Sequence, residues 1–331
     1  MEEDENKKVC SIPFRFCEVN EGGNVTPCCS VYCKGYKFGN IKTKDFNTVW
    51  NSSAARNFRE KILSGDYSLC DMKLCGAMQL ETVKEIKEKY FDKSGKINPP
   101  VEIKMSWDTQ CNAACIICRD KFRKNTLKER IVQNLIAFNL RNVFKKIKVF
   151  NTSGGGDPFG SKYCRNLLKK IAAKNPDLKF YICTNGVLMS ENMCKKLGIY
   201  DRIEGVTVSV HAACKETYDK IVKFGNFNKV TENLAWLSKK KKEGKIRNIT
   251  LVFVINNLNY KDIPAFIELC QKFGANPGFS FYRHWGTEYG KDYSKTTVWD
   301  KNHPEYPEFV KVMNTPIVQE NKGCFTGLDF I

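Results

Sequence analysis

The chain has 331 residues, of which 42% are hydrophobic and 12% aromatic, so it is long enough to bury one large core or two ordinary ones. This composition excludes a disordered or collagen-like chain. The polar start MEEDENKK lacks the pattern of a signal peptide, and no stretch has the apolar length of a membrane span, so we expect a cytoplasmic protein without membrane contact.

The charge is strongly positive and uneven. The net charge is +18, and residues 119–174 alone hold fifteen Lys or Arg against three acidic residues, a net +12. A basic surface of this kind attracts nucleic acid, a phosphorylated substrate or an acidic electron-donor protein. The simpler interpretation, which we favour, is a set of solvated helix faces.

Residues 1–80 form the first region in chain order. They contain seven of the sixteen cysteines, many turn residues and only short apolar runs, so this region needs a staple to remain folded. In a long chain of the expected cytoplasmic location, metal or redox chemistry explains such cysteines better than disulfides. Residues 81–100 predict a charged linking helix over 81–92 and a linker that ends at Pro99 and Pro100, which cannot continue a helix.

From residue 101 onward, β-rich runs alternate with stretches of helical periodicity. The strands are expected at 101–107, 147–152, 178–183, 205–210, 249–255 and 278–282, and the clearest helices at 128–138, 161–174, 228–241 and 262–274. This alternation predicts an α/β fold with a parallel sheet, a partial (β/α)6 TIM-like barrel over 101–283, and catalytic residues at the carboxyl ends of its strands. We interpret residues 284–331 as a C-terminal extension that is incomplete at residue 331.

Three cysteines follow the first of these strands at the spacing C-x3-C-x2-C: Cys111, Cys115 and Cys118. Thiolates are natural ligands of iron–sulfur clusters, and three of them on one loop hold three irons of a four-iron cluster while the fourth stays open to another ligand. Zinc is the alternative metal, although structural zinc sites favour paired C-x2-C knuckles with four ligands.

This triplet, the glycine loop SGGGDPF after the second strand and the CTNG stretch after the third together resemble the radical S-adenosylmethionine (radical SAM) superfamily. The resemblance implies a [4Fe–4S] cluster on the triplet, with S-adenosylmethionine as the ligand of the open iron. It also implies cofactor-binding roles for residues at the strand ends: Gly154, Gly155, Gly156, Asp157, Thr184, Asn185, Ser209 and Asn256. His211 is a weak candidate for a substrate-facing catalytic residue, and a structural histidine is at least as good an interpretation.

The cysteine-rich region 1–80 resembles the SPASM or twitch auxiliary-cluster domain, here placed before the radical domain instead of after it. Cys10, Gly23 and Cys28 correspond to one half of its pattern, and Cys70 and Cys75 to the other. The resemblance implies a second [4Fe–4S] cluster on Cys10, Cys28, Cys70 and Cys75. Cys17, Cys29 and Cys33 are spare thiols that could replace one of these ligands, and a zinc knuckle made by the same cysteines remains the alternative.

The resemblance implies an enzyme that reductively cleaves S-adenosylmethionine to a 5′-deoxyadenosyl radical, which then abstracts hydrogen from a substrate. Our first expectation is a peptide- or protein-modifying maturase, and the alternative is a dehydrogenase or epimerase of a sugar or other small molecule. We expect an acidic flavodoxin or ferredoxin as electron donor, docked on a basic face that includes Lys145, Lys146 and Lys148. A zinc-stapled nucleic-acid-binding protein is the more distant alternative, disfavoured because the basic residues lack interleaved surface aromatics.

Overall fold

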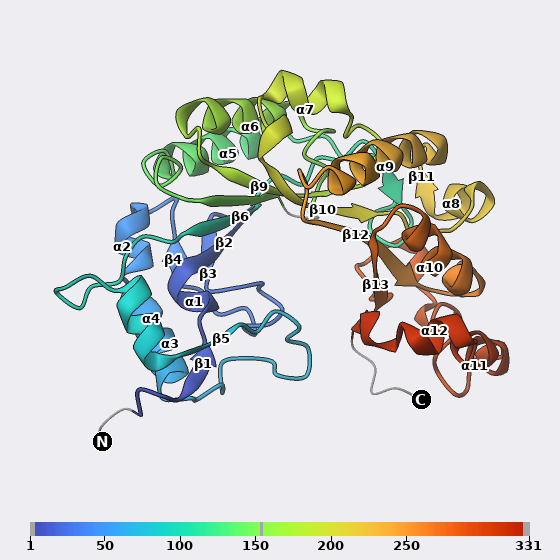
Figure 1. Cartoon of the computed structure of the whole chain (residues 1–331), viewed down its shortest axis with the longest axis horizontal. Coiled ribbons are helices and arrows are strands. Elements are labelled where there is room, and N and C mark those ends of the chain that lie inside the picture. Colours follow the sequence, from blue (N-terminus) through green and yellow to red (C-terminus); the bar gives the residue numbers. More distant parts are fainter. Residues whose placement is uncertain (1–3, 153–154, 327–331) are drawn as a thin grey trace. The chain divides into compact units, whose positions relative to one another are not determined.

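The computed structural model describes residues 4–152 and 155–326, and the chain divides into two compact units, which we describe separately (Figure 1). Unit 1 comprises residues 1–109, 125–155 and 166–180, and unit 2 comprises residues 110–124, 156–165 and 181–331. Helix α6 and strand β9 each run from one unit into the other.

Unit 1 contains a sheet with the strand order β4-β3-β2-β6-β8. Strands β2, β6 and β8 are parallel, whereas β2, β3 and β4 are joined antiparallel, so the hairpin of the cysteine-rich segment extends the parallel strands. Its elements are β1 (Lys8–Cys10), α1 (Ile12–Arg15), β2 (Phe16–Asn20), β3 (Asn24–Thr26), β4 (Gly39–Asn40), α2 (Phe46–Trp50), α3 (Ser53–Leu63), β5 (Leu80–Thr82), α4 (Val83–Tyr90), β6 (Glu102–Ser106), α5 (Leu127–Asn139), β8 (Val149–Thr152) and most of α6 (Lys162–Lys174).

Unit 2 contains the strand order β9-β10-β12-β13-β14, in which β10, β12, β13 and β14 are parallel neighbours. A small separate pair joins β7 and β11. The elements are β7 (Ala114–Cys115), β9 (Lys179–Thr184), α7 (Glu191–Leu197), β10 (Ile203–Ser209), α8 (Lys215–Ile221), β11 (Val222–Lys223), α9 (Phe227–Lys242), β12 (Asn248–Ile255), α10 (Ile263–Lys272), β13 (Asn276–Phe281), α11 (Tyr306–Met313), α12 (Pro316–Glu320) and β14 (Phe325–Thr326).

All six expected strands after residue 101 are present, and helices occupy the expected stretches between them. The burial of β12 alternates along the strand, since one face packs into the core and the other is covered less completely. The α/β prediction is confirmed, and the six strand–helix repeats are those of a partial TIM-like barrel.

Local sequence explains where the helices of unit 1 begin. Thr82 and Glu85 form a capping box at the start of α4, and Thr126 and Glu129 form the same arrangement at the start of α5. In the core of this unit, the Arg59 guanidinium lies 4.0 Å from the centre of the Trp50 ring and donates from Nε and Nη1 to two backbone carbonyl oxygens, while its Nη2 is buried without a hydrogen-bond acceptor among the described residues.

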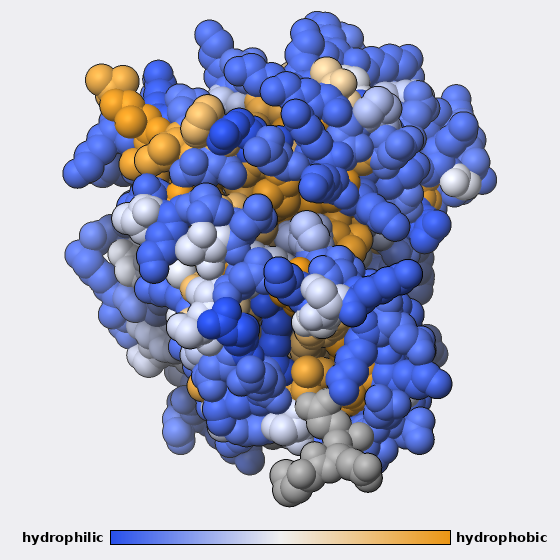
Figure 2. Space-filling model, turned by 90° about the vertical axis from the view of Figure 1, so that its left-hand side faces the viewer, coloured by the Kyte–Doolittle hydropathy of each residue, from blue (hydrophilic) through white to orange (hydrophobic). Residues whose placement is uncertain are grey.

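Helix α5 leaves an apolar stripe at its surface. Its members recur at three- and four-residue spacing: Leu127, Ile131, Leu135 and Phe138. Figure 2 shows hydrophobic surface among hydrophilic side chains on the face that it views.

Candidate functional site

The cysteine triplet lies on a loop of unit 2 that is fastened at its middle. Cys115 belongs to β7 and pairs with Val222 of β11, and the Ile116 amide donates to the Ile221 carbonyl oxygen at 3.0 Å. The Cys115 carbonyl oxygen then accepts from the Cys118 amide at 2.8 Å, which closes a turn. Cys111 and Cys115 are half-buried and Cys118 is exposed, so the loop presents its thiols from the interior outward to solvent.

The sulfur atoms of the triplet face hydrogen-bond donors. The Asn185 side-chain nitrogen lies 3.6 Å from Cys111 Sγ, and an Arg119 guanidinium nitrogen lies 3.5 Å from Cys118 Sγ. Burial, followed by the neighbouring Cys111 and Cys118, raises the pKa of Cys115 to about 12. The buried Cys115 thiol is therefore protonated until a metal binds, while donors directed at sulfur suit the thiolates of an iron–sulfur cluster.

Asp157 joins the loops around the triplet. One carboxylate oxygen accepts from the Thr184 hydroxyl at 2.7 Å and from the Asn185 backbone amide at 2.8 Å. The other accepts from the backbone amides of Phe159 and Gly160. Its own amide donates to the Gln110 carbonyl oxygen at 2.9 Å. The residue is only 2% exposed, so burial raises its pKa and these donors replace water around the carboxylate.

Two residues that the sequence analysis did not single out complete this junction. The Asn112 side-chain oxygen accepts from the Asn185 side-chain amide at 2.9 Å. Gly160 approaches the triplet loop so closely that an added Cβ would lie 2.8 Å from the Asn112 backbone nitrogen. The only signal in the sequence is that Gly160 closes the turn opened by the SGGGDPF loop.

The remaining cofactor-binding candidates lie near strand ends with different surroundings. Gly155 and Gly156 follow β8, and Gly154 lies outside the described residues. Ser209 is the last residue of β10, half-buried and paired in register with Val252.

His211 contacts the sheet backbone. It has a left-handed backbone (φ 64°), and its Nδ1 accepts from the Val254 amide at 3.2 Å just beyond the end of β10. The ring thereby accepts a hydrogen bond from a β12 amide that lies beyond the end of the β10–β12 pairing. Burial lowers the pKa of His211 to about 4, which keeps the ring neutral.

Asn256 is fully buried in the turn after β12. Its side-chain nitrogen donates to the Val254 carbonyl oxygen at 3.0 Å, and its side-chain oxygen accepts from the Leu258 amide and the Tyr289 hydroxyl. These contacts describe a turn-stabilising asparagine, and they use the same polar atoms that a ribose would require.

The four cysteines expected to hold the auxiliary cluster line one cavity of unit 1. Cys10, Cys28, Cys70 and Cys75 line it together with aromatic and aliphatic side chains, among them Tyr67. Burial and the nearby Cys10 and Cys75 raise the pKa of Cys70 to about 11. Thiols gathered from distant segments around one cavity fit an auxiliary cluster.

A fifth thiol belongs to the same group. A hydrogen bond between the thiols of Cys28 and Cys33 raises the pKa of Cys28 and lowers that of Cys33. None of the three spare thiols, Cys17, Cys29 and Cys33, lines the cavity, but Cys33 alone of them interacts with the cavity-lining Cys28. Of the three spare thiols, Cys33 is therefore the one placed to replace Cys28.

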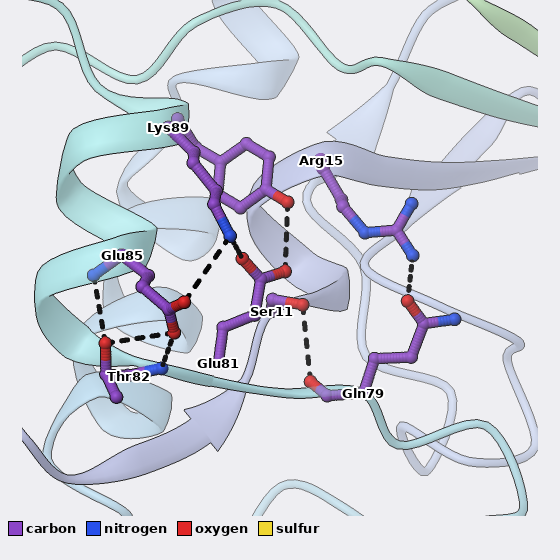
Figure 3. Close-up of polar contacts among 8 residues, drawn as sticks. Ser11, Arg15, Gln79, Glu81, Thr82, Glu85 and Lys89 are labelled. Atoms are coloured by element: carbon purple, nitrogen blue, oxygen red, sulfur yellow. Dashed lines mark hydrogen bonds and ion pairs between the residues drawn. The ribbon is translucent and has the colours of Figure 1, made fainter.

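Hydrogen bonds hold the segment after Cys75 against the segment after Cys10 (Figure 3). The Gln79 carbonyl oxygen accepts from the Ser11 amide at 2.8 Å and from the Ser11 hydroxyl at 3.3 Å, and the Gln79 side chain accepts from Arg15. Directly afterwards, β5 pairs with β1, with Cys10 opposite Leu80. These contacts bring both ends of the cysteine-rich segment to the cavity.

Within residues 4–152 and 155–326, no three His, Cys, Asp or Glu side chains converge as the ligands of a single metal ion. A four-iron cluster is a different case, because each thiolate binds its own iron. None of the described helices has the length and apolar character that crossing a bilayer requires.

Comparison with known families identifies the class of protein. Residues 106–270 match the Radical SAM superfamily, and residues 10–77 match SPASM, an iron–sulfur cluster-binding domain. The chain belongs to the radical SAM superfamily of enzymes, with a [4Fe–4S] cluster and S-adenosylmethionine as cofactors and an iron–sulfur domain in place of the zinc alternative.

Curated relatives match the chain in part. A probable GTP 3′,8-cyclase of Methanocaldococcus jannaschii is 26% identical over 178 residues, which cover 52% of this chain and 56% of the relative. The FeMo cofactor biosynthesis protein NifB of Methanocaldococcus infernus is 30% identical over 152 residues, covering 43% and 48%. The chain thus spans about half the length of the curated relatives it matches.

Two solved structures show a weaker likeness. The crystal structure of archaeal TYW1 aligns with a TM-score of 0.32 at 16% identity, covering 49% of this chain and 60% of that one. The structure of BtrN in complex with AdoMet and 2-DOIA aligns with a TM-score of 0.31 at 15% identity, covering 69% and 91%. The fold assignment rests instead on the strand order and the family match.

Proposed function

We propose that this chain cleaves S-adenosylmethionine at a cluster held by Cys111, Cys115 and Cys118 and uses the resulting radical to abstract hydrogen from a peptide or protein substrate. The observation that supports this most is the junction at which Asp157 and Asn185 hold three loops around the triplet. When bound, the cofactors supply one-electron cleavage of the sulfonium carbon–sulfur bond.

The protein's part is to position the reacting groups. The Gly155–Gly156 backbone, which has no Cβ, leaves room for the amino acid end of the cofactor to approach. Because all the hydrogen bonds of the Asp157 carboxylate described above come from the protein, we assign it the task of holding the loops in place. Ser209 at the end of β10 is the remaining polar candidate for a direct cofactor contact.

Our choice of substrate class depends on the SPASM domain at residues 10–77. An auxiliary iron–sulfur domain precedes the radical domain in this chain. The resemblance to the SPASM family implies peptide or protein modification. The auxiliary cluster would hold the substrate or accept an electron from the substrate radical.

A second candidate is the dehydrogenation or epimerisation of a sugar or other small molecule. A specific observation favours it: the relatives include proteins named as probable GTP 3′,8-cyclases, a name that refers to a small-molecule substrate. The basic segment 119–174 would suit an anionic substrate of that kind.

The test is anaerobic formation of 5′-deoxyadenosine. The protein is reconstituted with iron and sulfide, reduced with dithionite and supplied with S-adenosylmethionine, beside a variant with Cys111→Ala, Cys115→Ala and Cys118→Ala. We expect the product only with the triplet intact. Product formation that is equal in the variant would refute the assignment. Stimulation by a peptide library, compared with nucleotides and sugars, then decides between the two substrate classes.

A further inference from the structure

A cluster of exposed aromatic and basic side chains lies directly beside the triplet in unit 2. Phe122 is 42% exposed and Phe224 is 74% exposed, and their rings pack edge to face with centroids 6.4 Å apart. Water-exposed aromatic pairs of this size are unusual on a protein that uses its surface only for solubility. We call these two residues and the basic residues around them the aromatic–basic patch.

Both halves of the patch are attached to the triplet loop itself. Phe122 lies four residues after Cys118, and Phe224 directly follows β11, whose Val222 and Lys223 pair with Cys115 and Ala114. Cys118, the most exposed of the three thiols, therefore lies on the loop that carries the patch. In Figure 1, β7 and β11 lie together beside α8.

The backbone keeps Phe224 exposed at a conformational cost. Its φ of 61° lies in the left-handed region, which a bulky side chain rarely adopts. Packing against the core does not offset this strain, because the Phe224 ring is mostly in solvent and the ring that it contacts, Phe122, is itself exposed.

The charges around the rings are mainly positive. Residues 119–124 read Arg-Asp-Lys-Phe-Arg-Lys, and the single acid, Asp120, accepts a hydrogen bond from the Glu288 amide. The Lys124 ammonium lies 6.0 Å above the Phe122 ring, and Lys223 is exposed beside Phe224. The expectation that no surface aromatic interleaves with the basic segment is wrong at this patch.

We propose that the aromatic–basic patch is the docking surface for a small acidic electron-transfer protein, which delivers its electron through the exposed Cys118 side of the cluster. This proposal rests on the proposed function, since it presumes a cluster on the triplet. Two features of the patch select this partner. Its positive charge complements an acidic surface, and it adjoins the cluster loop, where electron transfer is fastest because its rate falls steeply with distance. The exposed rings supply the apolar contact that such a partner would bury.

The partner's electron passes to the cluster, so the step requires only a one-electron donor and no other reactant.

The experiment follows anaerobic bleaching of the cluster's visible absorbance, without S-adenosylmethionine, by reduced acidic flavodoxin or by dithionite. Three proteins are compared: wild type, a patch variant with Lys121→Glu, Lys124→Glu and Phe224→Asn, and a control with Lys145→Glu, Lys146→Glu and Lys148→Glu. Asparagine at position 224 tolerates the left-handed backbone, so the variant should retain its fold.

The expected result is a fall of about tenfold or more in reduction by flavodoxin for the patch variant, a weakened dependence on salt, and unchanged reduction by dithionite. The control variant should behave as wild type. Equal slowing with both reductants, no slowing at all, or slowing only in the Lys145–Lys146–Lys148 control would overturn the proposal.

A single-stranded oligonucleotide is the remaining probe, because basic residues around aromatics also suit nucleic acid. If it binds wild type but not the patch variant while flavodoxin reduces both equally well, the patch is a nucleic-acid site and the proposal is overturned. Failure of the proposed function looks different: dithionite would then reduce the cluster of wild type without forming 5′-deoxyadenosine when S-adenosylmethionine is added.

Discussion

The two cysteine sites are assembled in different ways. The triplet thiols come from eight consecutive residues, 111–118, whereas the auxiliary thiols come from segments spread over residues 10–75. The triplet loop is fixed by side chains of other loops, chiefly Asp157 and Asn185. The auxiliary cavity exists only when strand β1, the hairpin β2–β3 and the segment before β5 come together. A local site thus depends on its supporting contacts, and a dispersed site depends on the fold around it.

The largest expected effect is at the support of the local site. Asp157→Ala leaves three backbone amides and the Thr184 hydroxyl buried without their acceptor. We therefore expect a loss of about 4 kcal/mol in the free energy of unfolding. Anaerobic urea unfolding measures it, and the iron content of the triplet cluster should fall with it.

Asp177→Ala, a change at an exposed carboxylate, is the control and should shift the free energy of unfolding by less than about 0.5 kcal/mol. An equally small effect of Asp157→Ala would contradict the supporting role that we assign to the carboxylate.

The second prediction concerns the dispersed site. Cys70→Ala should remove the auxiliary cluster and lower the iron content by about four per chain, while dithionite-driven cleavage of S-adenosylmethionine continues. Iron and sulfide analysis gives the stoichiometry.

The matched control is Cys29→Ala, since Cys29 lies outside the cavity and its loss should leave the iron content unchanged. Full retention of iron in Cys70→Ala would show that Cys33 or another thiol replaces it. Loss of all iron would show that the two sites do not form independently.

The same contrast explains what the sequence could predict. Strand positions, helix periodicity and the triplet are local patterns, and the structure has them where they were expected. The surroundings of Asn256 and His211 depend on which backbone atoms a neighbouring strand leaves without a partner, which no local pattern encodes. Gly160 and Asn112 were missed for a related reason, because their importance lies in a close approach between two loops.

The third prediction tests whether His211 is a structural group. Its pKa is lowered to about 4 in the folded chain, below the ordinary value of 6.5, so the unfolded chain binds the proton more readily. Stability is therefore lost as the pH falls from about 6.5 toward 4, by about 2 kcal/mol between pH 8 and pH 5.

In His211→Asn this part of the pH dependence should disappear. The Asn side-chain oxygen can accept from the Val254 amide in place of Nδ1, and Asn tolerates the left-handed backbone. Urea unfolding at several pH values measures the effect, and His303→Asn serves as the control that should retain the wild-type pH dependence. An unchanged pH profile in His211→Asn would place the ring in a more solvated setting than the structure gives it.

The smallest expected effect concerns two helix caps, and it tests whether the segment that closes the auxiliary cavity retains the cluster. Thr82 and Thr126 cap their helices with the same capping box, but only Thr82 also belongs to a strand, β5, that pairs with β1 and places Leu80 opposite Cys10. Replacing either threonine with alanine should cost about 1 kcal/mol in the free energy of unfolding. Only Thr82→Ala should speed the loss of auxiliary iron to a chelator, since it loosens the β1–β5 pairing that closes the cavity. If both variants lose iron at the same rate, general destabilisation governs the dispersed site. If Thr82→Ala alone loses it faster, the closing segment itself retains the cluster.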